Sequence, residues 1–315
     1  MKNLLLSATA CAAVALLATG AAAETRVTYK SAKSTSSYYQ MAVQISQAIK
    51  AGTGGKVSVT VEESQGSVQN VREAAKRGAG YIFTTPPVLV KLAMAGKAMF
   101  KKKDPAYQEI RALFPIPSLT MHFVVRADTG VKTLADLKGK RFIIGKGSFG
   151  AREAAKYFKK FGIEVATVKV ELNAAVPALK NGQVDGFATA GSWPAPNVME
   201  AAAGTKIRVL SLTADQIKAS KRTRLVIPKG TYPGVDQDVV TTSLPVVAYT
   251  TTKTDADTAY LVTKAYWEQK AKMGKTNPWW NGVTPAMLSN IVGKLHPGAL
   301  KYYAEKGVAV PAALK

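Results

Sequence analysis

Cysteine and histidine are almost missing from this sequence of 315 residues. The single cysteine, Cys11, lies in an N-terminal segment that we expect to be removed, and only His122 and His296 supply imidazole. Without cysteine the remaining chain can form no disulfide, no thiol nucleophile and no thiolate metal site. The motifs H-E-x-x-H and G-x-S-x-G are absent too. His122 lies in an apolar strand and His296 precedes Pro297-Gly298, so we expect packing and capping there. We predict no catalytic residue, no metal and no cofactor.

The first residues have the composition of a secretory signal. Lys2 precedes an apolar stretch from Leu4 to Ala18, and Ala21-Ala22-Ala23 offers the small side chains that a signal peptidase requires. The stretch is short for a bilayer span, and no later segment is long and apolar enough to be one. We therefore predict a cleaved signal peptide over residues 1–23, a periplasmic location and a mature chain that does not itself span the membrane.

Acidic residues are also scarce, since 20 Asp and Glu stand against 43 Lys and Arg. Loss of residues 1–23 removes one lysine, which leaves 42 basic residues and a net charge of +22. The basic residues are spread along the chain, and short clusters such as Lys101-Lys102-Lys103 lack interleaved aromatic residues. This pattern favours a solvated basic surface that gathers anions, and not a nucleic-acid site.

Strands and helices alternate along the mature chain, and the same order of elements occurs twice. In the first set we predict strands over 26–29, 57–61 and 81–83. The helices between them place these residues inward: Tyr38, Met41, Ala42, Ile45 and Ile49, then, after an N-cap at Ser67, Val68, Val71 and Ala75. In the second set we predict strands over 141–144, 168–172 and 184–188. Their helices bury Ala151, Ala154, Ala155 and Phe158, then, after a cap at Asn173, Val176 and Leu179.

Alternating strands and helices predict parallel sheets, because each parallel crossover needs a helix on one face of the sheet. Two such sets predict an α/β protein of two lobes. The apolar runs 120–126 and 244–249 would cross between the lobes as hinge strands. From Thr254 the chain is helical and should pack on the first lobe. We expect lobe 1 to comprise 24–126 and 243–315, and lobe 2 to comprise 127–242.

In open α/β sheets, ligands bind beyond the carboxyl ends of the strands, where helix N-termini present free N–H groups. Four loops meet this condition: Ser31–Tyr39, Ser64–Ser67, Gly145–Arg152 and Thr189–Asn197. They are rich in hydroxyl groups and glycine and poor in acids, which suits a small organic anion. The candidate ligand-binding residues are Ser34, Thr35, Ser36, Ser37, Tyr38, Gln65, Gly66, Ser67, Thr85, Ser148, Phe149, Gly150, Arg152 and Trp193.

Three of these assignments leave alternatives open. Either Tyr38 or Tyr39 could contact a ligand, since one of the two must face the core. Trp193 could stack on a ligand or seal its lobe. Arg152 could be a plain surface charge, although a cation in the first turn opposes the helix dipole, and binding an anion would explain its position.

The loop Gly145-Lys146-Gly147-Ser148-Phe149-Gly150 also fits the dinucleotide pattern G-x-G-x-x-G, with Glu171 as the ribose acid. We do not adopt that interpretation, because Lys146 and Phe149 are bulky for a tight phosphate turn and a nicotinamide cofactor is not expected outside the cytoplasm. A different anion-binding turn between strand and helix fits better.

The order of motifs resembles the TAXI solute receptors, the substrate-binding subunits of one class of tripartite ATP-independent periplasmic (TRAP) transporters. The resemblance covers nearly the whole mature length and rests on these segments: Tyr38-Tyr39, Gly66–Asn70, Val124–Asp128 with Leu134–Lys140, Asn181–Phe187, Gly230–Gly234 and His296–Ala299. It implies a two-lobed, periplasmic-binding-protein-like (type II) fold. It also implies a receptor that closes on a small carboxylate or amino acid and delivers it to membrane permease subunits.

The chain departs from that family at the second lobe. Phe149 and Ala151 stand where the resemblance implies hydroxyl side chains, while Arg152 keeps its arginine. We therefore expect an organic anion with an apolar or aromatic portion against Phe149, with Trp193 as a second candidate contact. An exported enzyme acting on a small organic acid is the alternative function, and a secreted adhesin is a third.

Overall fold

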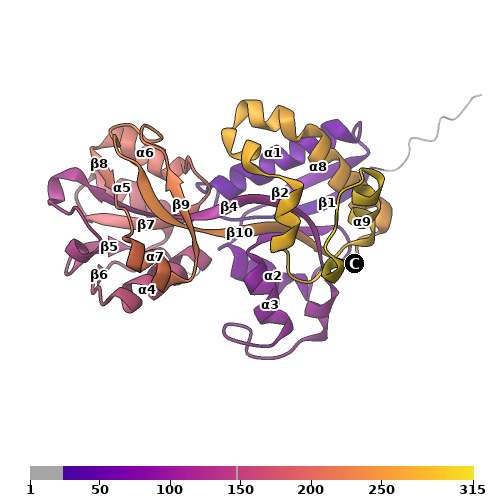
Figure 1. The fold of residues 1–315 in the computed structure, drawn as a ribbon, viewed down its shortest axis with the longest axis horizontal. Coiled ribbons are helices and arrows are strands. Elements are labelled where there is room, and N and C mark those ends of the chain that lie inside the picture. The colour runs from indigo at the N-terminus through magenta and orange to yellow at the C-terminus, as the bar shows by residue number, and fades with distance from the viewer. Residues whose placement is uncertain (1–23, 147) are drawn as a thin grey trace, which may run out of the picture.

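Two groups of parallel strands, joined by a long antiparallel pair, form the framework of this protein. The computed structural model describes residues 24–146 and 148–315. The predicted signal peptide, residues 1–23, lies outside the described residues, as does Gly147. The strands form one curled sheet, and the central path runs in the order β2-β1-β3-β10-β4-β7-β5-β6. Strands β4 (Ile110–Arg126) and β10 (Val239–Thr251) pair antiparallel and run from one side of the molecule to the other (Figure 1).

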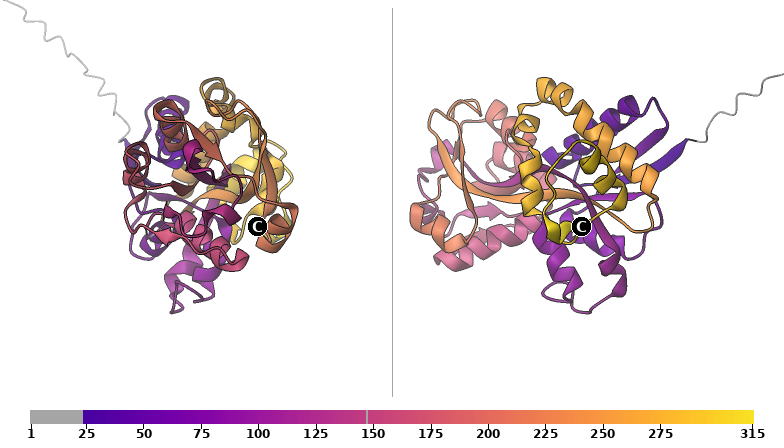
Figure 2. Two further views of the ribbon diagram at one scale, coloured as in Figure 1. Left: turned by 90° about the vertical axis from the view of Figure 1, so that its left-hand side faces the viewer. Right: turned by 45° about the vertical axis from the view of Figure 1, so that its right-hand side comes forward.

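The first lobe holds the parallel strands β2, β1 and β3. Its N-terminal elements are β1 (Thr25–Lys30), α1 (Ser37–Gly52), β2 (Val57–Glu62), α2 (Ser67–Ala74), β3 (Tyr81–Thr85) and α3 (Pro87–Met94). The C-terminal elements are α8 (Ala256–Thr276), β11 (Lys294–Leu295) and α9 (Pro297–Glu305). Helix α8 packs against α1 and α9, and Figure 2 shows this C-terminal segment against the lobe that contains the N-terminal strands. The helical C-terminal region thus packs beside the N-terminal helix α1.

The second lobe repeats the plan with the parallel strands β7, β5 and β6. Its elements are β5 (Arg141–Ile143), α4 (Phe149–Phe161), β6 (Ala166–Thr167), α5 (Ala175–Lys180), β7 (Gly186–Gly191), α6 (Pro196–Gly204), β8 (Ile207–Val209), α7 (Ala214–Ser220) and β9 (Thr223–Ile227). Figure 1 shows these elements on the opposite side of β4 and β10 from α1 and α8. The predicted fold class, an α/β fold of two lobes with two crossing strands, is confirmed.

The sequence pattern misplaced several local features. No strand runs over 168–172: β6 ends at Thr167, and the 3-10 turn Leu172–Ala174 follows. The alternating Val168, Val170 and Leu172 do pack on the core of the second lobe, but the segment has no partner strand beyond the bond from the Val168 N–H to the Phe142 carbonyl. Asn173 lies inside the 3-10 turn, so it does not cap α5.

Two helices also differ from the prediction. Gly66 is the N-cap of α2, with a φ of 105° that suits glycine, and Ser67 is the first helical residue. The last fully buried residue of α2 is Ala74, and Ala75, its C-cap, is partly buried and packs against the core as predicted. On α4, Ala155 is exposed, and Glu153 and Tyr157 are buried in its place. Glu153 can face inward because its carboxylate accepts two hydrogen bonds from the Arg222 guanidinium, at 2.9 and 3.0 Å.

Candidate functional site

A small cavity lies where the carboxyl ends of the parallel strands of the two lobes meet. Its volume is about 70 Å3, roughly twice the share of one water molecule in the liquid. All four predicted loops contribute to it, and its lining residues are Ala32, Lys33, Ser36, Tyr38, Gln65, Gly66, Ser67, Leu119, Ile144, Lys146, Ser148, Phe149, Gly150, Ala151, Glu171, Leu172, Ala188, Thr189 and Ala190. Eight of the fourteen candidate residues are therefore brought together.

The first loop reaches the cavity through the N-terminus of α1. The Ser36 hydroxyl accepts a hydrogen bond from the Tyr38 N–H at 3.1 Å and so caps the helix. The Tyr38 hydroxyl donates to the Pro117 carbonyl of β4 at 3.0 Å, which fixes the ring against the wall of the cavity. Tyr38, and not Tyr39, is therefore the tyrosine that lines it.

The second loop is tied to the first and touches the other lobe. The Ser64 hydroxyl donates to the Ser31 carbonyl and accepts from the Gly66 N–H, each at 2.9 Å. A Cβ on Gly66 would lie 3.6 Å from the Ser148 Cβ, which measures how near the lobes come. The N-terminus of α2 thus faces the N-terminus of α4 across the cavity, and both helix dipoles favour negative charge there.

The third loop starts α4 beside strand β7. The Ser148 hydroxyl accepts from the Ala151 N–H at 3.0 Å, and Phe149, which is only 6% exposed, is one of the residues that line the cavity. Gly150 lies so close to β7 that a Cβ there would be 2.6 Å from the Ala190 Cβ. Glycine at this position lets the helix begin at the cavity.

The fourth loop is held from behind by a buried chain of hydrogen bonds. The Ala195 N–H donates to the Tyr232 hydroxyl at 2.9 Å, and that hydroxyl lies 2.8 Å from His122 Nε2. His122 Nδ1 lies 3.2 Å from the Thr120 carbonyl, so Nδ1 carries the proton and Nε2 accepts. Burial lowers the pKa of His122 to about 4, which keeps the ring neutral. His122 thus supports a cavity loop and does not contact the cavity itself.

Six candidate residues do not line the cavity in this conformation: Ser34, Thr35, Ser37, Thr85, Arg152 and Trp193. Two of them are engaged elsewhere. The Ser34 N–H donates to Glu63 Oε1 at 2.6 Å. Hydrogen bonding by the Ser34 side chain, and then by its backbone, lowers the pKa of Glu63. The Ser37 hydroxyl accepts from the Ser192 N–H at 2.8 Å, a bond from the first lobe to the second.

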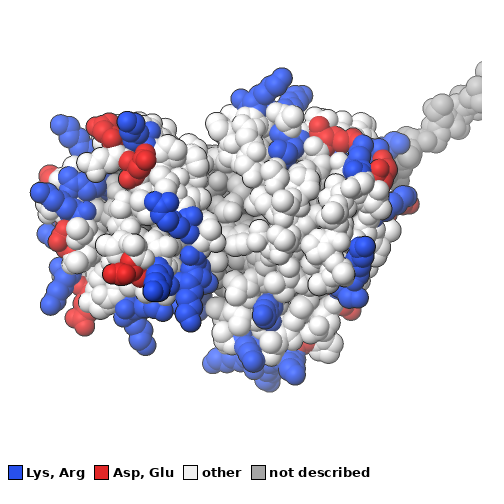
Figure 3. Space-filling model, in the orientation of Figure 1, with Lys and Arg blue, Asp and Glu red and all other residues white. Residues whose placement is uncertain are grey.

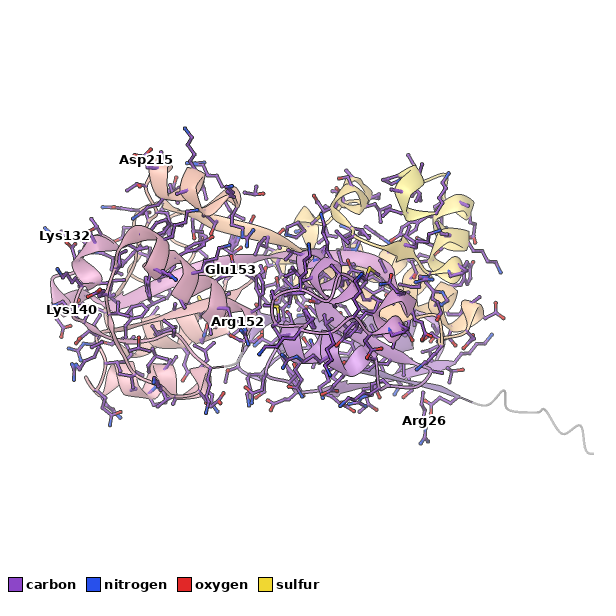
Figure 4. All side chains as sticks on the ribbon, turned by 90° about the horizontal axis from the view of Figure 1, so that it is seen from below. Arg26, Lys132, Lys140, Arg152, Glu153 and Asp215 are labelled. Atoms are coloured by element: carbon purple, nitrogen blue, oxygen red, sulfur yellow. The ribbon has the colours of Figure 1, made fainter. Side chains whose placement is uncertain are left out.

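Thr35 is half-buried in the turn before α1, and the other three candidates lie away from the cavity lining. Thr85 is fully buried in the sheet, with its hydroxyl 3.4 Å from the Pro86 carbonyl. Trp193 packs on the core of the second lobe. Arg152 is exposed in the first turns of α4, next to the junction of the lobes (Figure 4).

Three charged residues of the cavity were absent from the prediction: Lys33, Lys146 and Glu171. Lys33 lies within the first predicted loop, and Lys146 and Glu171 were considered only as parts of the dinucleotide pattern. Two lysines, one glutamate and three helix N-termini give the cavity a net positive character. On the face seen in Figure 3, Lys and Arg side chains are spread over both lobes. The cavity is therefore suited to hold an anion.

The larger hollows are less suited to a ligand gripped by two lobes. An open hollow of about 1040 Å3 is lined by residues between Ala127 and Val239, all from the second lobe, so lobe closure would not enclose it.

Across 24–146 and 148–315, no group of three or more His, Cys, Asp or Glu side chains is placed to hold a metal ion. Within the same ranges, none of the helices has the length and apolar character to cross a bilayer.

Comparisons with known proteins agree with this architecture. The sequence matches the NMT1-like family over residues 30–307. The structure is similar to the periplasmic binding protein BugD, with a TM-score of 0.55, 12% identity and coverage of 92% of this chain and 100% of BugD. It is also similar to MatC from Rhodopseudomonas palustris with bound malate, with a TM-score of 0.57, 11% identity and coverage of 90% and 96%. At these identities the likeness concerns the fold, and the two-lobed type II fold of periplasmic binding proteins is confirmed.

Proposed function

The chain belongs to the NMT1-like family, and from that premise we propose that it is a periplasmic solute receptor that binds a small organic anion between its two lobes. The observation that carries the proposal is the cavity itself. Helix N-termini and hydroxyl groups from both lobes converge on it.

The ligand class follows from the lining. Lys33 and Lys146 supply positive charge, and Tyr38, Leu119 and Phe149 supply apolar and aromatic walls. We infer a carboxylate or amino acid whose apolar or aromatic portion lies against Phe149. The volume of about 70 Å3 is too small for such a molecule, so the lobes must separate along β4 and β10 to admit it. When the lobes are separated, Arg152 and Trp193 are candidates for further contacts with the ligand.

Delivery to a TRAP-type membrane permease is the finer part of the proposal. It rests on the resemblance to the TAXI receptors and on the predicted signal peptide, together with the described helices, none of which could span a membrane. We propose that residues 24–126 and 243–315 form one moving body and that 127–242 form the other, with Arg126 and Ser243 at the transitions between them.

A thermal-shift screen of organic acids tests the proposed function. The melting temperature of a receptor rises in the presence of its ligand, because the ligand binds only the folded state and so stabilises that state. The ligand is recovered chemically unchanged. Recovery of an altered molecule would support the alternative, an exported enzyme acting on a small organic acid.

A pair of lysine variants tests the location of the site. Lys146→Ala removes a positive charge from the cavity. The dissociation constant of the ligand from this variant should be about tenfold or more higher than from the wild type, as expected for a lost charge-assisted hydrogen bond. Lys156→Ala is the matched control, because Lys156 is exposed on α4 and outside the cavity lining. Equal affinities of the two variants would contradict the site.

A further inference from the structure

One acidic side chain lies among the residues of the cavity. Glu171 comes from the second lobe, just after the edge strand β6, and it faces a site otherwise dominated by Lys33, Lys146 and helix N-termini. An anion receptor gains nothing from an unneutralised carboxylate beside its ligand, since like charges repel. Glu171 therefore calls for an explanation in terms of the ligand.

The side chain of Gln65 bridges Glu171 to the first lobe. Only one of the two orientations of its amide matches donors with acceptors. In that orientation Gln65 Nε2 donates to Glu171 Oε2 at 3.1 Å, and Gln65 Oε1 accepts from Lys33 Nζ at 3.2 Å. A donor thus faces the second lobe and an acceptor faces the first.

Within the described residues, no cation balances the charge of Glu171. Among the ion pairs within 4.0 Å that the described part of the chain forms, none includes Glu171. The contrast is Glu153 on the same lobe, which is matched by the Arg222 guanidinium at 2.9 Å. Gln65 is exposed, so its bridge lies at the mouth of the cavity, and contacts of this kind contribute little to stability. A ligand with the same polarity could replace the amide.

We infer that Glu171 is a specificity-determining residue of the cavity. It favours an acid that carries a hydrogen-bond donor, such as an ammonium or hydroxyl group, beside the carboxylate, and it disfavours an acid with a second carboxylate in that place. The anionic group lies toward Lys33, as the amide oxygen does, and the donor lies toward Glu171, as the amide nitrogen does. This inference rests on the proposed function, because it assigns polarity to the ligand of the same cavity.

Matched acids that differ in one group test the inference. One series is alanine, lactate, propionate and methylmalonate, and the other is phenylalanine, phenyllactate, phenylpropionate and benzylmalonate. Within a series only the substituent beside the carboxylate changes, from ammonium to hydroxyl, hydrogen and carboxylate. Each acid is tested by thermal shift and, where the melting temperature rises, by calorimetric titration with the wild-type protein, Glu171→Gln and Glu200→Gln.

The expected result is a dissociation constant about tenfold or more lower for the ammonium or hydroxyl member than for the malonate of the same series. Glu171→Gln should shrink this ratio to within about threefold, because the amide neither repels a carboxylate nor attracts an ammonium group as strongly. Glu200→Gln, an exposed acid of α6 outside the cavity, should leave the ratio unchanged.

The outcomes separate this inference from the function on which it rests. Tighter binding of the malonates by the wild-type protein, or an equal ratio in Glu171→Gln and the wild type, would overturn the role of Glu171 and leave the receptor function standing. If no acid of either series raises the melting temperature, both the inference and the proposed ligand class are wrong.

Discussion

Replacing His122 by glutamine should make the free energy of unfolding less sensitive to pH between pH 4 and pH 7. His122 is fully buried in β4 and lies between the Tyr232 hydroxyl and the Thr120 carbonyl. Glutamine can accept the hydrogen bond from Tyr232 and donate one to Thr120, but it cannot take up a proton. The substitution therefore removes the titration and retains most of the packing.

The magnitude follows from the pKa of the buried ring. Burial lowers the pKa of His122 to about 4, against about 6.5 in an unfolded chain. Between these values the unfolded chain binds more protons than the folded one, so stability falls as the pH falls. The contribution is complete above about pH 6.5 and decreases by about 2 kcal/mol at pH 5 and by about 3 kcal/mol at pH 4. Below pH 4 the decrease approaches its limit of about 3.4 kcal/mol.

Urea unfolding of the wild type and His122→Gln at several pH values measures this difference. Carboxylates and His296 titrate in both proteins, so their effects cancel when the two curves are subtracted. The wild type should lose about 3 kcal/mol more than the variant between pH 7 and pH 4. A difference that stays constant over that range would refute the assignment of His122 as a buried, neutral support of the fourth loop.

Two further substitutions test the packing around the cavity. Gly150→Ala would place a Cβ 2.6 Å from the Ala190 Cβ, so α4 must shift away from β7. We expect a loss of about 1–3 kcal/mol in urea unfolding and weaker ligand binding. Gly78→Ala, with no atom within 4 Å of the added Cβ, is the control and should change stability by less than about 0.5 kcal/mol; equal losses in both would contradict the close approach. Ser37→Ala leaves the buried Ser192 N–H without its hydrogen-bond acceptor on the first lobe. The free energy of unfolding should fall by about 1–3 kcal/mol. An unchanged midpoint of urea unfolding would show that this hydrogen bond is not formed in solution.

The general position of the cavity could be predicted from the sequence because it depends on chain topology. Parallel strands place their carboxyl ends, and the helix N-termini that follow, at one edge of a sheet. Ser36, Gln65–Ser67 and Ser148–Gly150 follow such strand ends directly, and the structure brings them together. Their order along the chain was sufficient for that conclusion.

The direction of single side chains could not be predicted in the same way. Arg152 follows the loop by only a few residues, but the helical period turns it outward while Phe149 faces the cavity. Ser37 is directed to a backbone N–H of the other lobe. The direction of each side chain depends on which face of its helix packs on the core. On α4 the buried face includes Glu153 and Tyr157 where the sequence pattern predicted Ala155, a difference of two positions.

Contacts between the two lobes could not be predicted from the sequence. Lys33 and Glu171 are far apart along the chain, and they share a partner only because Gln65 lies between the two lobes. The false strand over 168–172 has a related cause, since a pattern of side chains records packing but not the presence of a neighbouring strand.

A crystal structure of the protein with the small molecule that co-purifies with it, or with the tightest acid from the screen, tests the central claim most directly. The account predicts density for an unaltered acid between Gln65–Ser67 of the first lobe and Ser148–Gly150 of the second, with its carboxylate toward Lys33. Density in the hollow of the second lobe near Thr205–Val209, with the cavity between the lobes empty, would contradict it.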